Sequence, residues 1–299
     1  MIVMSLYGGL GNQMYQYAFA KQLSKMTGQP VKFKLEFHTK GKDFPRNLDV
    51  DKFNLSLPIQ EITKQEFLFF KMKLKAAIKL ATLFSIPNKS LKLQEYKLSQ
   101  PLALDQFKGL KNVSLDGYWQ NIDYFSAIRQ DLQKDFDLSF SDYDNKEVKR
   151  KIAAAGHHSV ALHIRRGDYI ANANANKLHG ICSQDYYVKA VSWLREHYGE
   201  SLLFFVFSDD PDWVRENIAT LSLSEKNAEI IAHNDGQQGF YDMMLMKQCK
   251  HHVIANSTFS WWPAWLSDKN GMVIAPNQWF SGENNKKKPN IFPDDWLYI

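Results

Sequence analysis

The chain has 299 residues, of which 44% are hydrophobic and 14% aromatic, and a formal net charge of +5. This composition excludes an intrinsically disordered chain, and the length predicts two domains of about 150 residues each. Two cysteines, Cys182 and Cys249, are too few for a disulfide framework or a zinc cluster, which favours a reducing compartment such as the cytoplasm.

The N-terminal residues predict neither a signal peptide nor a membrane anchor. Residues 1–9 lead directly into a glycine turn, without a basic segment followed by a long apolar stretch. The longest uncharged segment, residues 253–267, contains several polar residues and is shorter than the roughly 20 apolar residues that span a bilayer.

The first half of the chain opens with a strand, a glycine turn and a helix. Residues 2–6 form a short apolar strand, and residues 12–27 have apolar side chains spaced by three or four, which predicts a helix that Gly28 ends. Residues 31–37 alternate apolar and charged side chains, as in a half-buried strand. A basic stretch over residues 61–97 is predicted to be helical.

The second half alternates strands and helices more regularly. Strands are predicted at 160–164, 202–207, 229–232, 253–255 and 272–275. Helices are predicted at 184–198, with Ser183 as its cap, from Pro211 onward, at 240–249, and over a tryptophan-rich segment from about residue 260. This alternation predicts an α/β fold with parallel sheets covered on both faces, whose ligands bind at the carboxyl ends of the strands.

Lysines gather in the basic stretch and near the C-terminus, and a solvated surface is the simplest interpretation. The first cluster is interleaved with Phe67, Phe70, Leu74 and Ile78 at helical spacing, which leaves peripheral contact with an anionic membrane as an alternative. No recognition motif supports nucleic-acid binding. The clustered lysines are Lys71, Lys73, Lys75, Lys79, Lys89, Lys92, Lys97, Lys286, Lys287 and Lys288.

A glycine-rich turn follows the first strand and reads Gly-Gly-Leu-Gly-Asn-Gln over residues 8–13. Glycines such as Gly9 and Gly11 let the backbone approach a ligand closely, and the next helix offers unpaired N–H groups to an anion. The motif does not match the dinucleotide fingerprint, because Met14 stands where its last glycine would be, and it lacks a P-loop lysine. A tight turn without a ligand is the alternative.

The strand at 160–164 ends in the sequence His-Ile-Arg-Arg-Gly-Asp-Tyr over residues 163–169. Arginine presents a rigid fork of donors that matches phosphate, so Arg165 or Arg166 is predicted to stabilise a diphosphate leaving group. The other arginine would then pair with Asp168. Two surface salt bridges without a ligand are the alternative.

Two more polar clusters follow predicted strands. After the strand at 202–207, Asp209 is assigned to a ligand and Asp210 to the cap of the helix that begins at Pro211. After the strand at 253–255, the sequence reads Asn-Ser-Thr-Phe-Ser-Trp-Trp-Pro over residues 256–263. Because proline is tolerated in the first turn of a helix, a helix with Ser260 as its cap is predicted, with the preceding residues in a phosphate-binding loop.

Together these motifs resemble glycosyltransferase family eleven, the bacterial alpha-1,2-fucosyltransferases. The order and spacing match along the whole chain except residues 40–113, where no motif is placed. The motifs include Cys-Lys-His-His-Val-Ile-Ala before Asn256, a Pro-Asp-Asp-Trp sequence at 293–296, and His179 followed by Gly180.

The resemblance implies a GT-B-like fold: an acceptor-side domain over residues 1–155 and a GDP-fucose-binding domain over residues 156–299, both Rossmann-like and facing a cleft. It implies an inverting transfer of L-fucose from GDP-fucose to the 2-hydroxyl of a terminal galactose, without a metal or other cofactor, during surface polysaccharide synthesis. The enzyme would be cytoplasmic, at most peripheral at the inner membrane.

The resemblance also implies roles for individual residues. Arg165 would hold the β-phosphate, and Asn12 would reach the reaction centre. Asp168 and His179 are candidates for a general base, although a loose transition state would ask little of one. The implied substrate-binding residues are Gly9, Gly11, Gln13, His163, Arg166, Asp209, Asn256, Ser257, Thr258, Phe259 and Ser260.

Four other functions remain open from the sequence. A sugar-nucleotide-binding or glycan-binding module would bind without turnover, and a transferase that uses another nucleotide sugar would share the same motifs. A nicotinamide-dependent oxidoreductase is disfavoured by the imperfect glycine turn. A metal-dependent transferase would use an Asp-x-Asp triplet such as Asp210-Pro-Asp212, but similar triplets recur elsewhere in the chain.

Overall fold

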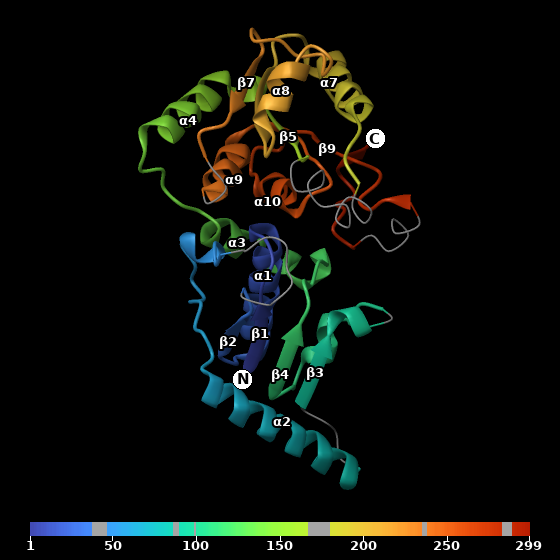
Figure 1. Ribbon diagram of the computed structural model, residues 1–299. Helices are drawn as coiled ribbons and strands as arrows, with labels where there is room; N and C mark the ends of the chain where they lie inside the picture. The colour runs from blue at the N-terminus through green and yellow to red at the C-terminus, as the bar shows by residue number, and fades with distance from the viewer. Residues whose placement is uncertain (38–46, 86–89, 99, 167–179, 235–237, 283–288) are drawn as a thin grey trace. The chain divides into compact units, whose positions relative to one another are not determined.

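The chain folds into two α/β units. The computed structural model describes residues 1–37, 47–85, 90–98, 100–166, 180–234, 238–282 and 289–299. The first unit is Met1–Phe136 and the second is Asp137–Ile299. Each contains one parallel sheet, of four and six strands respectively (Figure 1), which confirms the predicted fold class.

The first unit has the strand order β2-β1-β4-β3. Its strands are β1 (Ile2–Leu6), β2 (Val31–Leu35), β3 (Ser90–Gln94) and β4 (Asn112–Asp116), and β1 pairs in parallel with both β2 and β4. Helix α1 (Leu10–Thr27) connects β1 to β2, and α2 (Lys64–Leu83) precedes β3. The order reverses between β1 and β4, so a ligand of this sheet is expected where these two strands end.

Helix α1 begins at Leu10, two residues before the predicted start, because Gly9 serves as its N-cap. Its far end follows the prediction: Gly28 adopts a left-handed conformation with φ of 67°, and its N–H bonds the carbonyl of Ser24 at 2.8 Å. Helix α2 begins with a capping box, in which the Thr63 hydroxyl accepts from the N–H of Glu66 and the Glu66 carboxylate accepts from the N–H of Thr63.

The apolar residues of α2 that suggested membrane contact as an alternative in the sequence instead face the protein. Phe70 and Leu74 are buried together with Val3 and Ile62, and Phe67 and Ile78 pack against the same cluster. The basic stretch is also not helical throughout, because β3 follows α2 at Ser90. Strands β3 and β4 are additions to the predicted elements.

The second unit has the strand order β7-β6-β5-β8-β9-β10, which in chain order is the 3-2-1-4-5-6 arrangement of the dinucleotide-binding fold. All its neighbouring strands are parallel. The order reverses between β5 and β8. Its strands are β5 (Ser159–Ile164), β6 (Leu203–Ser208), β7 (Ala228–Ile231), β8 (His251–Val253), β9 (Val273–Ala275) and β10 (Leu297–Tyr298).

The buried face of this sheet packs on the connecting helices, with Val160, Leu162, Phe204, Val206 and Val253 in one core cluster. Burial of such residues on both faces is why these strands read as nearly continuous apolar runs. The helices are α4 (Tyr143–Ala155), α7 (Gln184–Tyr198), α8 (Pro211–Asn217), α9 (Gly239–Gln248) and α10 (Thr258–Leu266), whereas α3 (Arg129–Asp135) belongs to the first unit.

The division between the units falls after Phe136 and not at the predicted boundary of 155/156. Helix α4 explains the difference. It precedes the first strand of the second sheet, yet it packs against α9 and β5 of that sheet. Residues 137–155 therefore belong to the second unit.

Candidate functional site

The second unit brings three polar sequence motifs together near the point where its strand order reverses. His163 and Arg165 lie at the end of β5 and just beyond it, and Ser257 begins α10 after the neighbouring strand β8. Strand β6 ends at Ser208, next to β5 on its other side, and leads to Asp209. Three polar clusters from distant parts of the sequence thus share one edge of the sheet.

His163 is buried and held by the α10 segment. Its Nδ1 lies 2.8 Å from the hydroxyl of Ser260, and its ring centroid lies 5.5 Å from that of Phe259. Burial, with a smaller contribution from the charge of Arg165, lowers the pKa of His163 to about 3. The imidazole is therefore neutral near pH 7, and its contact with Ser260 links the β5 motif directly to the α10 motif.

The two arginines after β5 pair with the two aspartates after β6. Arg165 Nε lies 3.2 Å from Asp209 Oδ2, and the other oxygen of Asp209 accepts a hydrogen bond of 2.8 Å from the backbone N–H of Arg166. Each of the side chains of Arg165 and Asp209 is about one-fifth exposed. Asp209 therefore has a positioning role, and the guanidinium of Arg165 still reaches solvent.

Arg166 lies against α8 instead of standing free beside Arg165. Its guanidinium carbon is 3.7 Å from the ring centroid of Trp213, and its Nε is 3.5 Å from Asp210 Oδ2. Asp210 also accepts from the N–H of Trp213 at 3.3 Å, which confirms its predicted role as the cap of α8. Asp168, the partner proposed from the sequence, lies outside the described residues.

Helix α10 begins earlier than predicted. Ser257, and not Ser260, is its N-cap: the Ser257 hydroxyl accepts from the N–H of Phe259 at 3.3 Å, and Trp261 N–H bonds the Ser257 carbonyl at 3.1 Å. Pro263 therefore lies inside the helix, where the hydrogen bond that its missing N–H would have made to Phe259 is lost. The burial of three tryptophans on the same short helix, at positions 261, 262 and 265, offsets this loss.

The start of α10 has features of an anion site. The positive end of the helix dipole favours negative charge there, and Thr258 and Phe259 in the first turn are partly exposed. Ser260 is buried and turned to His163, so its hydroxyl supports the neighbouring strand end. Arg165 and this helix start lie at the ends of adjacent parts of the sheet and are both suited to one phosphate group.

Asn256 joins three loops. Its Nδ2 donates to the carbonyl oxygens of Gly180 at 3.2 Å and Trp279 at 3.4 Å, and its Oδ1 accepts from the thiol of Cys182 at 3.4 Å. The side chain is buried. The structure gives Asn256 the role of fixing the loop that leads to α10, and its contact with a ligand stays a prediction.

The glycine turn of the first unit is shaped by one position. Gly8 has φ of 84°, and a Cβ atom there would lie 3.0 Å from Tyr118 Cε1 and 3.2 Å from Asn12 Nδ2. A Cβ atom at Gly9 would meet nothing within 4 Å, so the space in front of the start of α1 is open to a ligand. Gly11 and Asn12 lie in the first turn of α1, and Asn12 Oδ1 accepts from Gln120 Nε2 at 2.8 Å.

Gln13, predicted to bind substrate, is fully buried and uses its whole amide inside the unit. Its Nε2 donates to the carbonyl oxygens of Gly8 at 2.9 Å and Asn47 at 2.8 Å. Its Oε1 accepts from the N–H groups of Asp49 and Val50. Two donors and two acceptor positions are thereby occupied, so Gln13 fixes the glycine turn to the segment after β2 and has no group left for a ligand.

Sequence analysis missed a polar and aromatic cluster where β4 ends, beside the glycine turn. Asp116 accepts from the hydroxyl of Tyr7 at 3.4 Å and from Gln94 Nε2 at 3.2 Å. The rings of Tyr7 and Tyr118 lie 5.1 Å apart, and Tyr118 is 36% exposed. The signal in the sequence was the alternating segment at 112–116, which ends in Asp116 and is followed directly by Gly117.

Glu95 holds the turn after β4 in place. Its Oε2 accepts from the N–H groups of Tyr118 at 2.6 Å and Trp119 at 2.8 Å. Burial raises the pKa of Glu95, although the backbone hydrogen bonds act in the opposite direction. A Cβ atom at Gly117 would lie 2.3 Å from Glu95 Cβ, so glycine is required for this close approach.

The two candidates for a general base, Asp168 and His179, lie outside the described residues. In the part of the chain that the structure describes, no group of three or more His, Cys, Asp or Glu side chains is arranged to hold a metal ion. No helix among the described residues is long and apolar enough to cross a bilayer.

Comparison with known proteins identifies the family. The model of glycosyl transferase family 11 matches residues 1–299. Alpha-1,2-colitosyltransferase from Escherichia coli is 34% identical over 300 residues that cover 100% of this chain and 98% of the relative. The O-antigen biosynthesis glycosyltransferase WbnK from Escherichia coli is 30% identical and covers 98% and 99% of the two chains.

More distant matches are consistent with this family. Galactoside alpha-(1,2)-fucosyltransferase 2 from Gorilla gorilla gorilla is 26% identical, over 90% of this chain and 69% of the relative. Among solved structures, FUT1 of Arabidopsis thaliana in complex with GDP aligns with a TM-score of 0.50 at 12% identity, over 91% of this chain and 69% of that chain. This likeness supports the GT-B fold. The chain belongs to glycosyl transferase family 11.

Proposed function

We propose that this protein transfers L-fucose from GDP-fucose to the 2-hydroxyl of a terminal galactose, with inversion at the anomeric carbon. The observation that carries the proposal is the position of Arg165. It stands where the strand order of a dinucleotide-type sheet reverses, held by Asp209, beside the start of α10.

The reaction needs positive charge at this place. When the bond from the sugar to GDP breaks, negative charge grows on the β-phosphate, and a guanidinium that is already in position lowers the barrier. Arg165 supplies this charge, and the dipole of α10, whose first turn lies beside the end of β5, adds partial positive charge. His163 stays neutral beside them, so it contributes hydrogen bonding without competing for the phosphate.

We assign the acceptor galactoside to the first unit, at the end of β4. Tyr7 and Tyr118 provide aromatic surface for the apolar face of a sugar ring, and Asp116 provides a carboxylate for its hydroxyls. The glycine turn lies beside this cluster, because a Cβ atom at Gly8 would be 3.0 Å from Tyr118 Cε1 and 3.2 Å from Asn12 Nδ2. Asp116 is thus a further candidate for contact with the reacting hydroxyl.

A second donor has specific support. The relative at 34% identity is an alpha-1,2-colitosyltransferase, so the donor of this chain could equally carry colitose, a sugar that lacks the 3-hydroxyl of fucose. A site that hydrogen-bonds the 3-hydroxyl would reject the deoxy sugar strongly, whereas an apolar site there would accept both. Competition between GDP-fucose and GDP-colitose for one acceptor separates these cases.

The decisive experiment incubates the protein with GDP-fucose and lactose and measures released GDP, followed by mass spectrometry and linkage analysis of the product. We expect an α-1,2-linked fucosyl-lactose, unchanged by a chelator, and at least a hundredfold slower formation with Arg165→Ala. Donor binding without product would instead identify a binding module. Loss of activity with chelator would favour a metal-dependent transferase.

The same proposal gives the protein a place in the cell. Its relative WbnK is described as an O-antigen biosynthesis enzyme, and we propose that this chain modifies a surface polysaccharide precursor in the cytoplasm, next to the inner membrane. Deletion of the gene should remove one deoxyhexose residue from the surface polysaccharide, measured by sugar composition analysis. An unchanged composition would contradict this assignment.

A further inference from the structure

Helix α2 has a second apolar face that lies in solvent. Its inner face packs on the first unit through Phe70 and Leu74. The six side chains of the outer face are between 51% and 70% exposed, which is unusual for adjacent large apolar residues. We define this outer face by Leu68, Phe69, Met72, Leu80, Leu83 and Phe84.

Lysines border the outer face. With 3.6 residues per turn, Lys71, Lys75 and Lys79 lie along one edge of the exposed apolar stripe, and Lys73 lies on the other edge. All four are exposed. Glu66 is the one acidic residue in the sequence of α2, and it is paired with Lys32. The surface is therefore apolar in the middle and positive at both margins.

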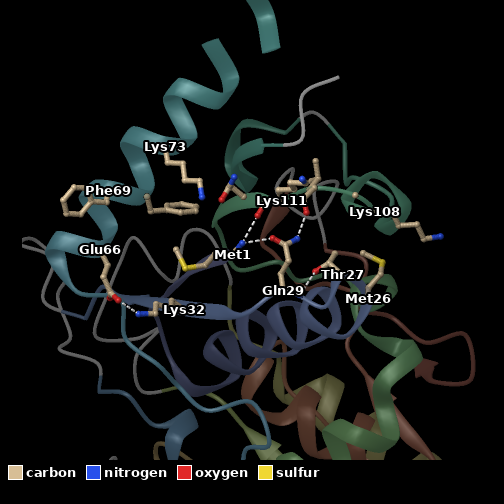
Figure 2. Close-up of a pocket in the computed structure, with 14 residues that line it drawn as sticks. Met1, Met26, Thr27, Gln29, Lys32, Glu66, Phe69, Lys73, Lys108 and Lys111 are labelled. Carbon is tan, nitrogen blue, oxygen red and sulfur yellow. Dashed lines mark hydrogen bonds and ion pairs between the residues drawn. The ribbon is translucent and has the colours of Figure 1, made fainter. Parts of the chain in front are cut away.

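A pocket of about 980 Å³ is lined by residues of α2 and by residues at the start of β1 and β4, and Figure 2 shows these residues. Phe69 and Lys73 enter its lining from α2, and Lys73 extends toward Met1 in the figure. Lys108 and Lys111 line it from the segment before β4. Among the described lining residues, Glu66 is the one carboxylate, so the pocket is suited to an anionic group.

We propose that the outer face of α2 and this pocket dock the protein on an anionic phospholipid membrane. The apolar side chains would enter the boundary between headgroups and acyl chains, while the lysines bind lipid phosphates at the same depth. A second copy of the chain fits the surface less well. Symmetric pairing would place the lysine margins of two copies against each other, with no acidic residue on α2 to offset the repulsion except the paired Glu66.

The docking surface and the cluster proposed for the acceptor lie at opposite ends of the first sheet. Met1 and Asn112, at the start of β1 and β4, line the pocket, whereas Gly8 follows β1 and Asp116 is the last residue of β4. Docking would leave the carboxyl ends uncovered. Membrane binding and transfer to a soluble acceptor are therefore separable, and the docking proposal stands independently of the choice of donor.

The test is co-sedimentation of the full chain with vesicles of phosphatidylcholine alone, or of phosphatidylcholine with about 30% phosphatidylglycerol. Each is measured at two salt concentrations, about 0.05 M and about 0.5 M. We expect binding to the anionic vesicles only, with a large decrease at high salt. Phe69→Ser/Leu83→Ser and Lys75→Glu/Lys79→Glu should each lower the partition coefficient at least tenfold. Both should keep wild-type transfer to lactose, which shows that they fold.

Matched controls come from exposed residues of the second unit. Tyr143→Ser removes a side chain that is 78% exposed, and Lys149→Glu/Lys226→Glu makes the same charge change as the lysine variant. Both controls should bind vesicles like the wild type. Failure to sediment with anionic vesicles, equal binding to neutral vesicles, or equal losses in the controls would overturn the proposal. So would a dimer, detected by light scattering, that the Phe69→Ser/Leu83→Ser variant abolishes while vesicle binding remains unaltered.

Discussion

Arg165 Nε lies 3.2 Å from Asp209 Oδ2, across the gap between the segments that follow two neighbouring strands. The other oxygen of Asp209 accepts from the backbone N–H of Arg166, so one carboxylate fixes both the side chain and the main chain at the end of β5. This double contact positions the guanidinium before a donor arrives. Preorganisation of this kind is what gives a charged group its catalytic value.

Removal of the guanidinium should have the largest effect on the reaction. Arg165→Ala is expected to lower kcat/KM for the sugar nucleotide at least a hundredfold, because the β-phosphate loses its main counter-charge. This corresponds to a loss of about 3 kcal/mol in transition-state stabilisation. Arg165→Lys keeps the charge but not the planar fork, and should recover only part of the loss. Steady-state GDP release measures both. Wild-type kcat/KM in Arg165→Ala would remove the basis of the proposed function.

Substitutions of the two aspartates after β6 should affect different properties, kcat for Asp209 and the free energy of unfolding for Asp210. Asp209→Asn is expected to lower kcat about tenfold or more, because Arg165 loses its ion pair while the fold stays intact. Asp210→Ala should instead lower the free energy of unfolding by about 1 kcal/mol, since the N-cap of α8 is lost. Kinetics and urea unfolding on both variants test this division. Equal kinetic effects of the two substitutions would contradict it.

The glycine turn offers a matched pair of substitutions. Gly8→Ala should lower the free energy of unfolding by about 1–3 kcal/mol, because the residue has positive φ and the new Cβ would crowd Tyr118. Gly9→Ala meets open space and should leave stability within about 0.5 kcal/mol. If a substrate approaches this turn, the added methyl group of Gly9→Ala will nevertheless raise the KM for that substrate. Unchanged kinetics in Gly9→Ala would argue that the turn is only structural.

Asp116→Asn tests the acceptor assignment. The change keeps the size of the side chain but weakens its hydrogen bonds to sugar hydroxyls, so KM for lactose should rise about tenfold with little change in KM for GDP-fucose. Tyr143→Ser, far away in sequence and exposed, serves as the control. A larger fall in kcat than rise in acceptor KM would instead point to a role for Asp116 in proton removal. An effect on donor KM alone would contradict the assignment.

Two of the three buried histidines in the described part of the chain predict how stability depends on pH. Burial lowers the pKa of His163 to about 3 and that of His252 to about 4, whereas both have an ordinary value of 6.5 when unfolded. Below pH 6.5 the unfolded chain binds more protons, so the free energy of unfolding falls as pH decreases. Each histidine should account for about 2 kcal/mol of the loss between pH 7 and pH 5.

Urea unfolding at several pH values measures this dependence. His252→Gln is the test variant, because a glutamine amide can still donate to the carbonyl of Met246, which His252 contacts at 3.0 Å. Its stability should decrease less between pH 7 and pH 5 than that of the wild type. Parallel curves for the two proteins would show that His252 does not remain neutral in the folded chain.

The order of elements in the second unit could be predicted because its strands are buried on both faces. Strands β5 and β6 are continuous apolar runs, and each is followed at once by polar residues, so the carboxyl-end cluster of His163, Arg165 and Asp209 was visible in the sequence. The first unit was harder. Strands β3 and β4 contain only two apolar residues each, so their assignment depends on pairing with each other and with β1. The polar and aromatic cluster around Asp116, at the end of β4, was missed for this reason.

By itself, the sequence determined the family, the α/β class, the glycine turn, the cap at Asp210 and the motifs that meet at one sheet edge. These follow from local spacing and from the residue types that strand ends, caps and phosphate contacts require. Tertiary structure alone decided which carboxylate holds Arg165, that Gln13 and Asn256 use their amides internally, and which face of α2 remains exposed. Such choices depend on contacts between residues far apart in the chain, and local spacing carries no information about them.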